Sequence, residues 1–185
     1  MVNYRRARVP GATYFFTVTL RDRRSRMLTD HVDALREVVK CVRRRWPFRI
    51  DAVVVLPDHL HTIWTLPEGD ADFSKRWRAM HPRRAMQAQS MGLAFKARFT
   101  RRLVMRGIAL AHDRRGEYAL WQRRFWERLI RDAQDFACHV DYNPVKHGWV
   151  ARPLDWRWSS IHRYIRLELL PPDWAAVPEE GGFGE

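Results

Sequence analysis

The fold is decided by the stretch Ala52-Val53-Val54-Val55-Leu56-Pro57-Asp58-His59-Leu60-His61-Thr62-Ile63-Trp64. It reads as two strands separated by a Pro-Asp turn, because β-branched residues dominate on both sides of Pro57. In a strand, residues i and i+2 lie on the same face, so we expect His59 and His61 to point the same way and to be close enough to bind one metal ion. The residues between and after them, Leu60 and Thr62, should face the core. The spacing alone does not decide the matter, because many such pairs lie on edge strands without a ligand.

The flanking sequence predicts the elements that pair with this hairpin. Residues 13–20 are β-branched and aromatic and indicate a first strand. Asp30 is expected to cap a helix that runs to about Trp46 and stops at Pro47. The second and third strands are then residues 48–56 and 59–66.

The rest of the chain supplies helices and a further strand. Residues 72–106 have a basic helical pattern in two pieces, and residues 121–130 predict a fourth strand. A helix is expected from Asp132 to about Asn143, ended by Pro144. The resulting order predicts an α+β fold with a ferredoxin-like or RRM-like antiparallel sheet and helices packed on it.

The charge of the chain points to a polyanion as partner. The 185 residues include 34 Lys and Arg against 21 Asp and Glu, a formal net charge of +13. Such an excess is typical of nucleic-acid-binding proteins. Nine Trp, nine Phe and five Tyr are interleaved with arginine, and exposed aromatic rings of this kind bind unpaired bases, although most of them are expected in the core.

The sequence gives no sign of export or of membrane insertion. The basic N-terminal residues are not followed by a long apolar run, and no segment is long enough to span a bilayer. The two cysteines, Cys41 and Cys138, form neither a disulfide framework nor a Cys-x-x-Cys metal site. We therefore expect a cytoplasmic, nucleoid-associated protein.

Several segments together resemble the REP-associated tyrosine transposases, which are HUH-type single-strand DNA transposases with a His-hydrophobic-His motif. The matching segments, which run nearly from end to end, are Asn3-Tyr4-Arg5-Arg6, Phe15-Phe16-Thr17-Val18, Val54 to His61, Ile63 to Asp70, Phe73-Ser74-Lys75-Arg76-Trp77, Trp121 to Glu127, Asn143-Pro144-Val145-Lys146-His147-Gly148, Asp155-Trp156 and Ser159-Ser160. The resemblance implies a transposase domain over residues 1–150, followed by a C-terminal aromatic tail over residues 151–185.

The resemblance also implies a chemistry and a substrate. His59 and His61, with Asn143, would hold Mg²⁺ or Mn²⁺ against the scissile phosphate. A tyrosine would attack and form a 5′-phosphotyrosine link, and the substrate would be single-stranded hairpin DNA of the REP-like repeats. The arginines expected to contact DNA are Arg5, Arg6, Arg23, Arg24, Arg76, Arg98, Arg101, Arg102, Arg123 and Arg124.

The segment before Asn143 departs from the family. Similar proteins carry the catalytic tyrosine one helical turn before the asparagine. Here the sequence is His139-Val140-Asp141-Tyr142-Asn143, and the helix before the asparagine is a few residues shorter than in those proteins. Tyr142 is our candidate nucleophile. Alignment anchored on Asn143 would instead place His139 there, and Tyr118 is a weaker candidate.

Two other functions stay open. The chain can be a catalytically inactive relative that binds structured single-stranded nucleic acid. It can also be an unrelated His-x-His metallohydrolase, but no sequence pattern gathers His112, His139 and His147 as further ligands. A monomer and a homodimer are both compatible with the sequence.

Overall fold

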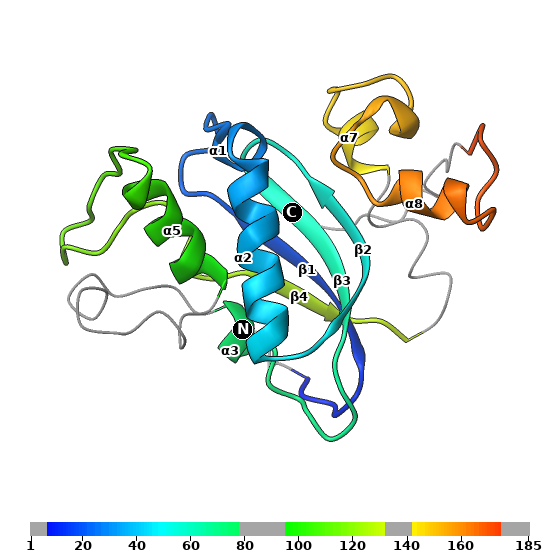
Figure 1. The fold of residues 1–185 in the computed structure, drawn as a ribbon, viewed down its shortest axis with the longest axis horizontal. Helices are drawn as coiled ribbons and strands as arrows, with labels where there is room; N and C mark the ends of the chain where they lie inside the picture. Colours follow the sequence, from blue (N-terminus) through cyan, green and yellow to red (C-terminus); the bar gives the residue numbers. More distant parts are fainter. Residues whose placement is uncertain (1–6, 78–94, 132–141, 175–185) are drawn as a thin grey trace, which may run out of the picture.

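A four-stranded antiparallel sheet forms the centre of the molecule in the computed structural model, which describes residues 7–77, 95–131 and 142–174. Figure 1 shows the sheet with α2 lying across one face. The strands are β1 (Thr13–Thr19), β2 (Arg49–Val55), β3 (His59–Thr65) and β4 (Trp126–Leu129), in the spatial order β2-β3-β1-β4. This order confirms the predicted ferredoxin-like α+β plan.

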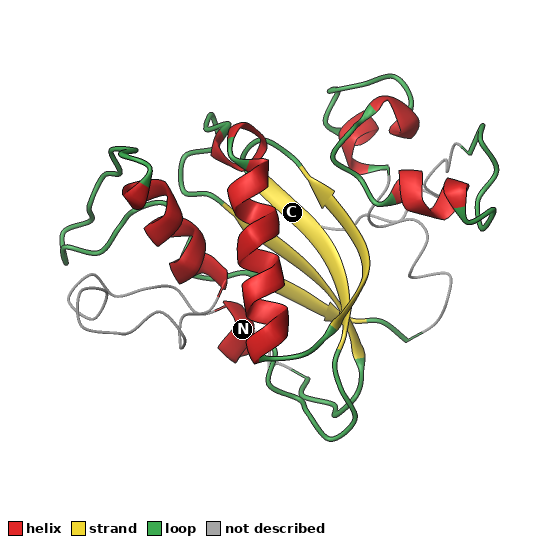
Figure 2. Ribbon diagram, in the orientation of Figure 1, coloured by secondary structure: helices red, strands yellow, loops and turns green. Residues whose placement is uncertain are grey.

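The helices lie on both sides of the sheet (Figure 2). Those that follow β1 and β3 in the chain are α1 (Met27–Asp30), α2 (Val32–Arg45), α3 (Ser74–Trp77) and α5 (Phe95–Met105). The C-terminal part contributes α7 (Asn143–Lys146), a 3₁₀ turn η2 (Pro153–Asp155) and α8 (Ile161–Arg166). None of the helices that the structure describes is long and apolar enough to cross a bilayer.

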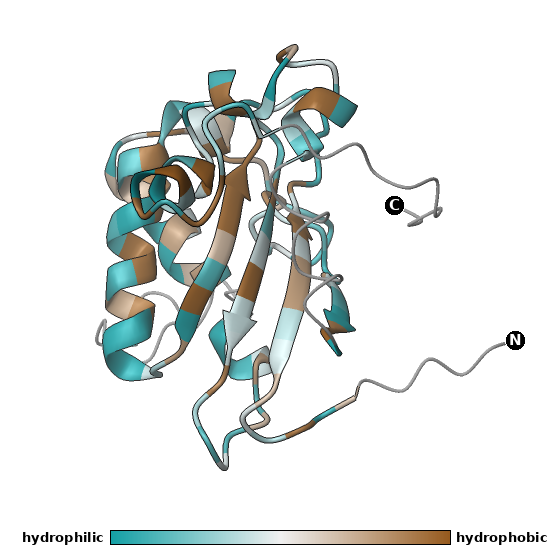
Figure 3. Cartoon of the chain, turned by 90° about the vertical axis from the view of Figure 1, so that its right-hand side faces the viewer, coloured by the Kyte–Doolittle hydropathy of each residue, from teal (hydrophilic) through white to brown (hydrophobic). Residues whose placement is uncertain are grey.

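Each face of the sheet carries its own apolar cluster. The larger contains Phe16, Leu60 and Trp64 from the strands together with Leu35 of α2 and Phe99 of α5. The smaller lies on the opposite face, where Phe15, Ala52, Val54 and Ile63 meet Trp156 and Tyr164 of the C-terminal segment; Ile130 packs there too. In Figure 3, α2 carries both hydrophilic and hydrophobic residues, as expected for a helix with one face on the sheet.

Several element boundaries differ from the prediction. Asp30 does not cap α2; it is the last residue of α1, and the chain bends at His31 before α2 begins. The fourth strand is shorter than predicted, because Trp121 forms only an isolated bridge with Leu20. The helix predicted from Asp132 lies mostly outside the described residues. Pro144 lies in the first turn of α7, where its missing N–H leaves no hydrogen bond unmade.

The C-terminal segment continues the sheet beyond β2. The backbone N–H of Val55 donates to the carbonyl of Trp158 at 2.9 Å, and that of Ser160 donates to the carbonyl of Val53 at 2.8 Å. Residues 156–164 therefore cover the β2 edge. The predicted domain boundary at residue 150 stays a prediction.

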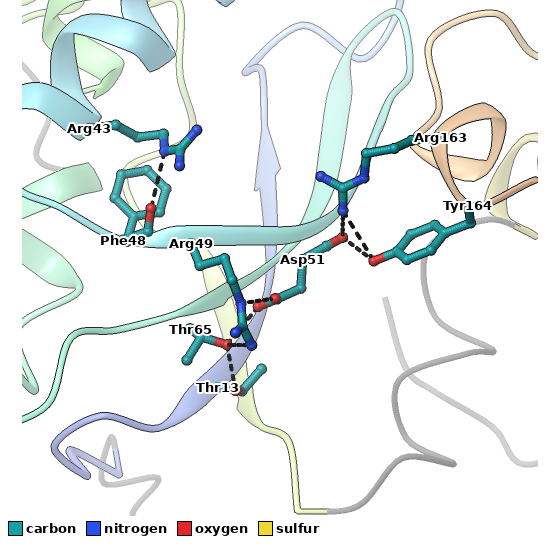
Figure 4. A network of polar contacts seen from close by, with 8 residues as sticks. All are labelled: Thr13, Arg43, Phe48, Arg49, Asp51, Thr65, Arg163 and Tyr164. Atoms are coloured by element: carbon teal, nitrogen blue, oxygen red, sulfur yellow. Dashed lines mark hydrogen bonds and ion pairs between the residues drawn. The ribbon is translucent and has the colours of Figure 1, made fainter. Parts of the chain in front are cut away.

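Figure 4 shows how the same edge is fixed around Asp51, the residue at which the β2–β3 register shifts. The Asp51 carboxylate accepts hydrogen bonds from Arg49 and from Thr65, the latter at 2.6 Å. Its carbonyl, which the irregular register turns outward, accepts from Arg163 at 2.8 Å and from the hydroxyl of Tyr164. One irregular residue thus ties β2 both to β3 and to α8.

Candidate metal centre

His59 and His61 lie side by side on one face of β3, as the strand period requires. Their ring centroids are 4.9 Å apart, and the two residues are only 2% and 5% exposed. His61 is paired with Thr17 of β1, and His59 with Thr19. The pair faces the smaller apolar cluster, while Leu60 and Trp64 face the larger one, as predicted.

Each of these imidazoles is held through its Nδ1 atom. Nδ1 of His59 donates to Oδ1 of Asp58 at 2.8 Å, and Nδ1 of His61 lies 2.9 Å from the hydroxyl of Thr17. The Nε2 atoms of both rings are buried and have no hydrogen-bond partner among the described residues. Unmade polar interactions at buried atoms are costly, and a metal ion is the ligand that would complete two imidazole nitrogens at this spacing.

A third histidine completes the cluster from a distant part of the sequence. His147 follows α7 directly, and its ring centroid is 4.8 Å from that of His59. One ligand nitrogen from each of His59, His61 and His147 can be chosen so that all three lie within 4.8 Å of one another. Sequence reasoning did not assign His147 to the site, because only the tertiary fold brings the residue after α7 next to His59 of β3.

Burial keeps the two strand histidines neutral. It lowers the pKa of His59 below the ordinary 6.5, although the neighbouring Asp58 carboxylate opposes this effect. It lowers the pKa of His61 further, with added repulsion from His59 and His147. A neutral imidazole offers a lone pair to a metal, so the environment favours the form that binds one.

Asp58 connects the cluster to the loop after β1. Its buried carboxylate contacts His59 through Oδ1 and the Nε of Arg23 through Oδ2, at 2.6 Å. Its carbonyl accepts the N–H of Leu20 at 2.7 Å, which fixes the Pro57-Asp58 turn against the end of β1. The carboxylate therefore holds the His59 ring in the tautomer whose Nε2 is free to bind a metal ion.

Tyr142 and Asn143 lie on the segment that carries His147. Tyr142 is half-buried and immediately precedes α7, and its carbonyl accepts from the N–H groups of Val145 and Lys146 at 3.0 Å. Asn143 begins α7, and its carbonyl accepts the N–H of His147 at 2.9 Å. The candidate nucleophile and the candidate third ligand thus belong to the same short turn as His147. His139 lies outside the described residues, and Tyr118 packs on His112 in a separate β-bridge.

The structure removes one arginine from the predicted DNA-contacting set. Arg76 has a fully buried side chain whose guanidinium donates to Asp70 at 2.9 Å and to the carbonyl of Pro47 at 2.6 Å. A buried, paired guanidinium cannot reach a phosphate, so this prediction is corrected.

The other predicted arginines have varied surroundings. Arg24, Arg123 and Arg124 are exposed, whereas Arg98 and Arg101 on α5 are half-buried. Arg102 pairs with Glu37, and Arg23 with Asp58. Arg5 and Arg6 lie outside the described residues.

Comparison with known proteins gives two close relatives. The chain is 44% identical over 188 aligned residues to the REP-associated tyrosine transposase of Escherichia coli K12, covering all of this chain and 98% of that protein. It is 40% identical to the putative REP-associated tyrosine transposase of Haemophilus influenzae, covering 97% of this chain and 96% of that one. No family model matches the chain.

A solved structure has the same fold over the whole length. It is described as a REP-associated tyrosine transposase bound to a REP hairpin, and it superposes with a TM-score of 0.79 at 44% identity. The match covers all of this chain and 98% of that one.

Proposed function

The chain belongs to the family of REP-associated tyrosine transposases, and from this premise we propose that it is a metal-dependent single-strand DNA endonuclease and strand transferase. We propose hairpin repeat DNA as its substrate, because the related solved structure is bound to a REP hairpin. The observation that carries the proposal is the cluster of His59, His61 and His147 on a buried face of the sheet.

The donor set fits a divalent ion. His59 and His61 would hold it through Nε2, with His147 as a further ligand and Asn143 as the one that the family resemblance adds. A divalent ion bound there supplies a Lewis acid that polarises the scissile phosphate. Imidazole nitrogen suits Mn²⁺ better than Mg²⁺, which prefers oxygen ligands, so of the two we place Mn²⁺ first.

Tyr142 is the proposed nucleophile. Its phenolic oxygen, having lost its proton, bonds to phosphorus while the bond from phosphorus to the 3′ oxygen breaks. The 3′ oxygen takes up a proton and leaves as a free hydroxyl, and the 5′ phosphate stays on the tyrosine as a diester. Attack by another 3′ hydroxyl reverses the step without an external energy source, so one site both cuts and rejoins.

Exposed arginines and the net charge of +13 would hold the DNA backbone. The exposed arginines among the described members of the predicted set are Arg23, Arg24, Arg123 and Arg124. Arg5 and Arg6, which lie outside the described residues, stay proposed on the sequence alone. We propose that the protein acts in the cytoplasm at the nucleoid, because its proposed substrate is repeat DNA.

A second function is supported by the shortened segment before Asn143. Because Tyr142 is directly adjacent to Asn143 in sequence, the usual one-turn separation of nucleophile and ligand is lost. A relative that binds hairpin DNA without cutting it is therefore the alternative.

One experiment separates the two functions. Wild type, Tyr142→Phe and Tyr118→Phe are incubated with labelled single-stranded hairpin DNA, with Mn²⁺ or with EDTA, and resolved on a denaturing protein gel. The proposal predicts a metal-dependent adduct that is lost in Tyr142→Phe and kept in Tyr118→Phe. DNA binding without an adduct would favour the inactive relative, and an adduct that survives Tyr142→Phe would assign another nucleophile.

A further inference from the structure

Trp126 is an exposed aromatic residue on the same face of the sheet as the histidine cluster. It is the first residue of β4, the strand at the edge of the sheet opposite β2, and it is 41% exposed. Exposing a large indole on a strand gains nothing for folding, because burial of apolar surface is what stabilises the fold. An exposed aromatic beside a candidate catalytic site is more informative than a scattered surface residue.

The register of the sheet places Trp126 in one row with a metal-site histidine. Thr17 of β1 pairs with His61 on one side and with Trp126 on the other. Directly paired residues in antiparallel strands point to the same face. With neighbouring strands about 4.8 Å apart, the indole begins roughly 10 Å from His61 along this row.

An aromatic ring fills the space between them. Phe15 stacks on His61 with ring centroids 5.5 Å apart, and it meets Trp126 edge to face at 5.6 Å. This packing supports the indole from beneath and leaves part of its surface to solvent. Trp126 is thus held in place by the same face that carries the metal ligands.

The position of Trp126 and the charge around it indicate which ligand would cover this surface. The β2 edge is covered by the C-terminal segment, whereas Trp126 stands on the β4 edge. Arg124 is exposed two residues before it, and the chain as a whole is strongly cationic. An aromatic ring beside cationic groups is the arrangement that binds single-stranded nucleic acid, in which bases stack on the ring and phosphates meet arginine.

We propose that Trp126 is the stacking platform for an unpaired base that neighbours the cleaved phosphate. The inference rests on the proposed function, since it places one nucleotide of the single-stranded flank of the hairpin on the β4 side of the metal centre. The base stacks because every base has a π face, so the platform tolerates different bases and positions the strand without reading its sequence.

The test compares two DNA probes and four proteins. The probes are a labelled hairpin with single-stranded flanks and the same hairpin without flanks, and the proteins are wild type, Trp126→Ala, Trp126→Tyr and Trp149→Ala. Trp149 is the matched control, because it is similarly exposed but packs on Trp156 instead of on the sheet row. Affinities are measured with metal absent, so that cleavage does not enter, and thermal unfolding checks that each variant is folded.

The inference predicts that Trp126→Ala binds the flanked hairpin about 5- to 100-fold more weakly, in line with the loss of one stacked base. Trp126→Tyr should retain most of the affinity, and Trp149→Ala and the flankless probe should show no comparable change. In wild type, 5-iodouracil placed in the flank should photo-crosslink to the peptide that contains Trp126.

Three results would overturn the inference. Equal binding of the flanked hairpin by wild type and Trp126→Ala would do so while leaving the proposed function intact. A dimer that Trp126→Ala converts to a monomer would show that a second copy of the chain covers this face. Failure of wild type to bind either hairpin would overturn the proposed function and the inference with it.

Discussion

The candidate site depends on the contacts that the Nδ1 atoms of His59 and His61 make, because these contacts orient the two rings. Asp58 accepts from His59, and the hydroxyl of Thr17 lies against His61, so both rings present Nε2 to the same space. Such supporting groups commonly alter metal affinity or activity 10- to 100-fold when they are removed. Arg23 adds a second contact to the Asp58 carboxylate, so the loop after β1 also bears on the orientation of His59.

Asp58→Asn should weaken Mn²⁺ binding about 10- to 100-fold, because the negative charge that supports His59 is lost while the side-chain volume is kept. Calorimetric titration of the protein with Mn²⁺ measures the change. Asp22→Asn is the matched control, since Asp22 is exposed and contacts Arg24 away from the cluster. Equal affinities of wild type and Asp58→Asn would show that the carboxylate does not support the site.

Arg76 shows that a charged residue of a helix can be buried when it connects neighbouring elements. Its guanidinium joins α3 to the preceding turn through Asp70 and to the α2–β2 connection through the carbonyl of Pro47. Burial alone would raise the pKa of Asp70, but hydrogen bonds from Arg76 and Lys75 outweigh it and hold the pKa below its usual value. The ion pair is therefore a structural contact between three segments.

Asp70→Ala should lower the free energy of unfolding by about 3–5 kcal/mol, because it leaves a buried guanidinium without its charge partner. Urea unfolding measures the loss. Asp30→Ala, which removes an exposed partner of Arg26, should cost less than about 1 kcal/mol. A similarly small loss in Asp70→Ala would contradict the structural role of the pair.

The attachment of the C-terminal segment to β2 can be tested at a single hydroxyl. Oγ of Ser160 accepts the N–H of Val53 at 2.9 Å, while the Ser160 N–H donates to the carbonyl of Val53. Ser160→Ala should cost about 1–3 kcal/mol, since it orphans a backbone donor between the sheet and the segment.

Arg152→Ala in the same segment provides the comparison for Ser160→Ala. It removes an exposed pair with Asp155 and should cost less than about 1 kcal/mol. Equal unfolding midpoints of Ser160→Ala and wild type in urea would argue against this attachment.

Sequence patterns predicted the features that depend on a single strand or helix. They missed the contacts that form only when separate elements pack together. The strand period places His59 and His61 on one face, and it also separates Leu60 from them, so the pair and its orientation followed from sequence. His147 reaches the cluster only because the tertiary fold brings the residue after α7 against His59 of β3, and no periodicity links the two segments. Arg76 was predicted to contact DNA for the same reason, since its partners Asp70 and Pro47 come from other segments.

For the whole molecule, burying neutral histidines makes stability depend on pH. The pKa values of His59 and His61 are lowered below 6.5 in the folded protein, so the unfolded chain binds more protons in the window beneath 6.5. Stability should therefore fall as pH decreases through that window. The loss should be larger for His61, whose pKa burial lowers well below 6.5, than for His59, where the Asp58 carboxylate opposes the effect of burial.

Urea unfolding of the metal-free protein at several pH values measures this dependence. His61→Gln removes one of the two titrating groups and should therefore flatten the slope. A wild-type stability that is level or rises as pH falls from 6.5 would contradict neutral burial of the pair.

The most direct test of the central claim, that His59, His61 and His147 together hold one divalent ion, is a Mn²⁺ titration followed by electron paramagnetic resonance. Wild type is compared with His147→Gln and with His112→Gln, whose histidine contacts Tyr118 outside the cluster. The account predicts one ion bound per wild-type chain, affinity at least about tenfold weaker in His147→Gln, and no change in His112→Gln. No binding by wild type, or equal binding by wild type and His147→Gln, would contradict it.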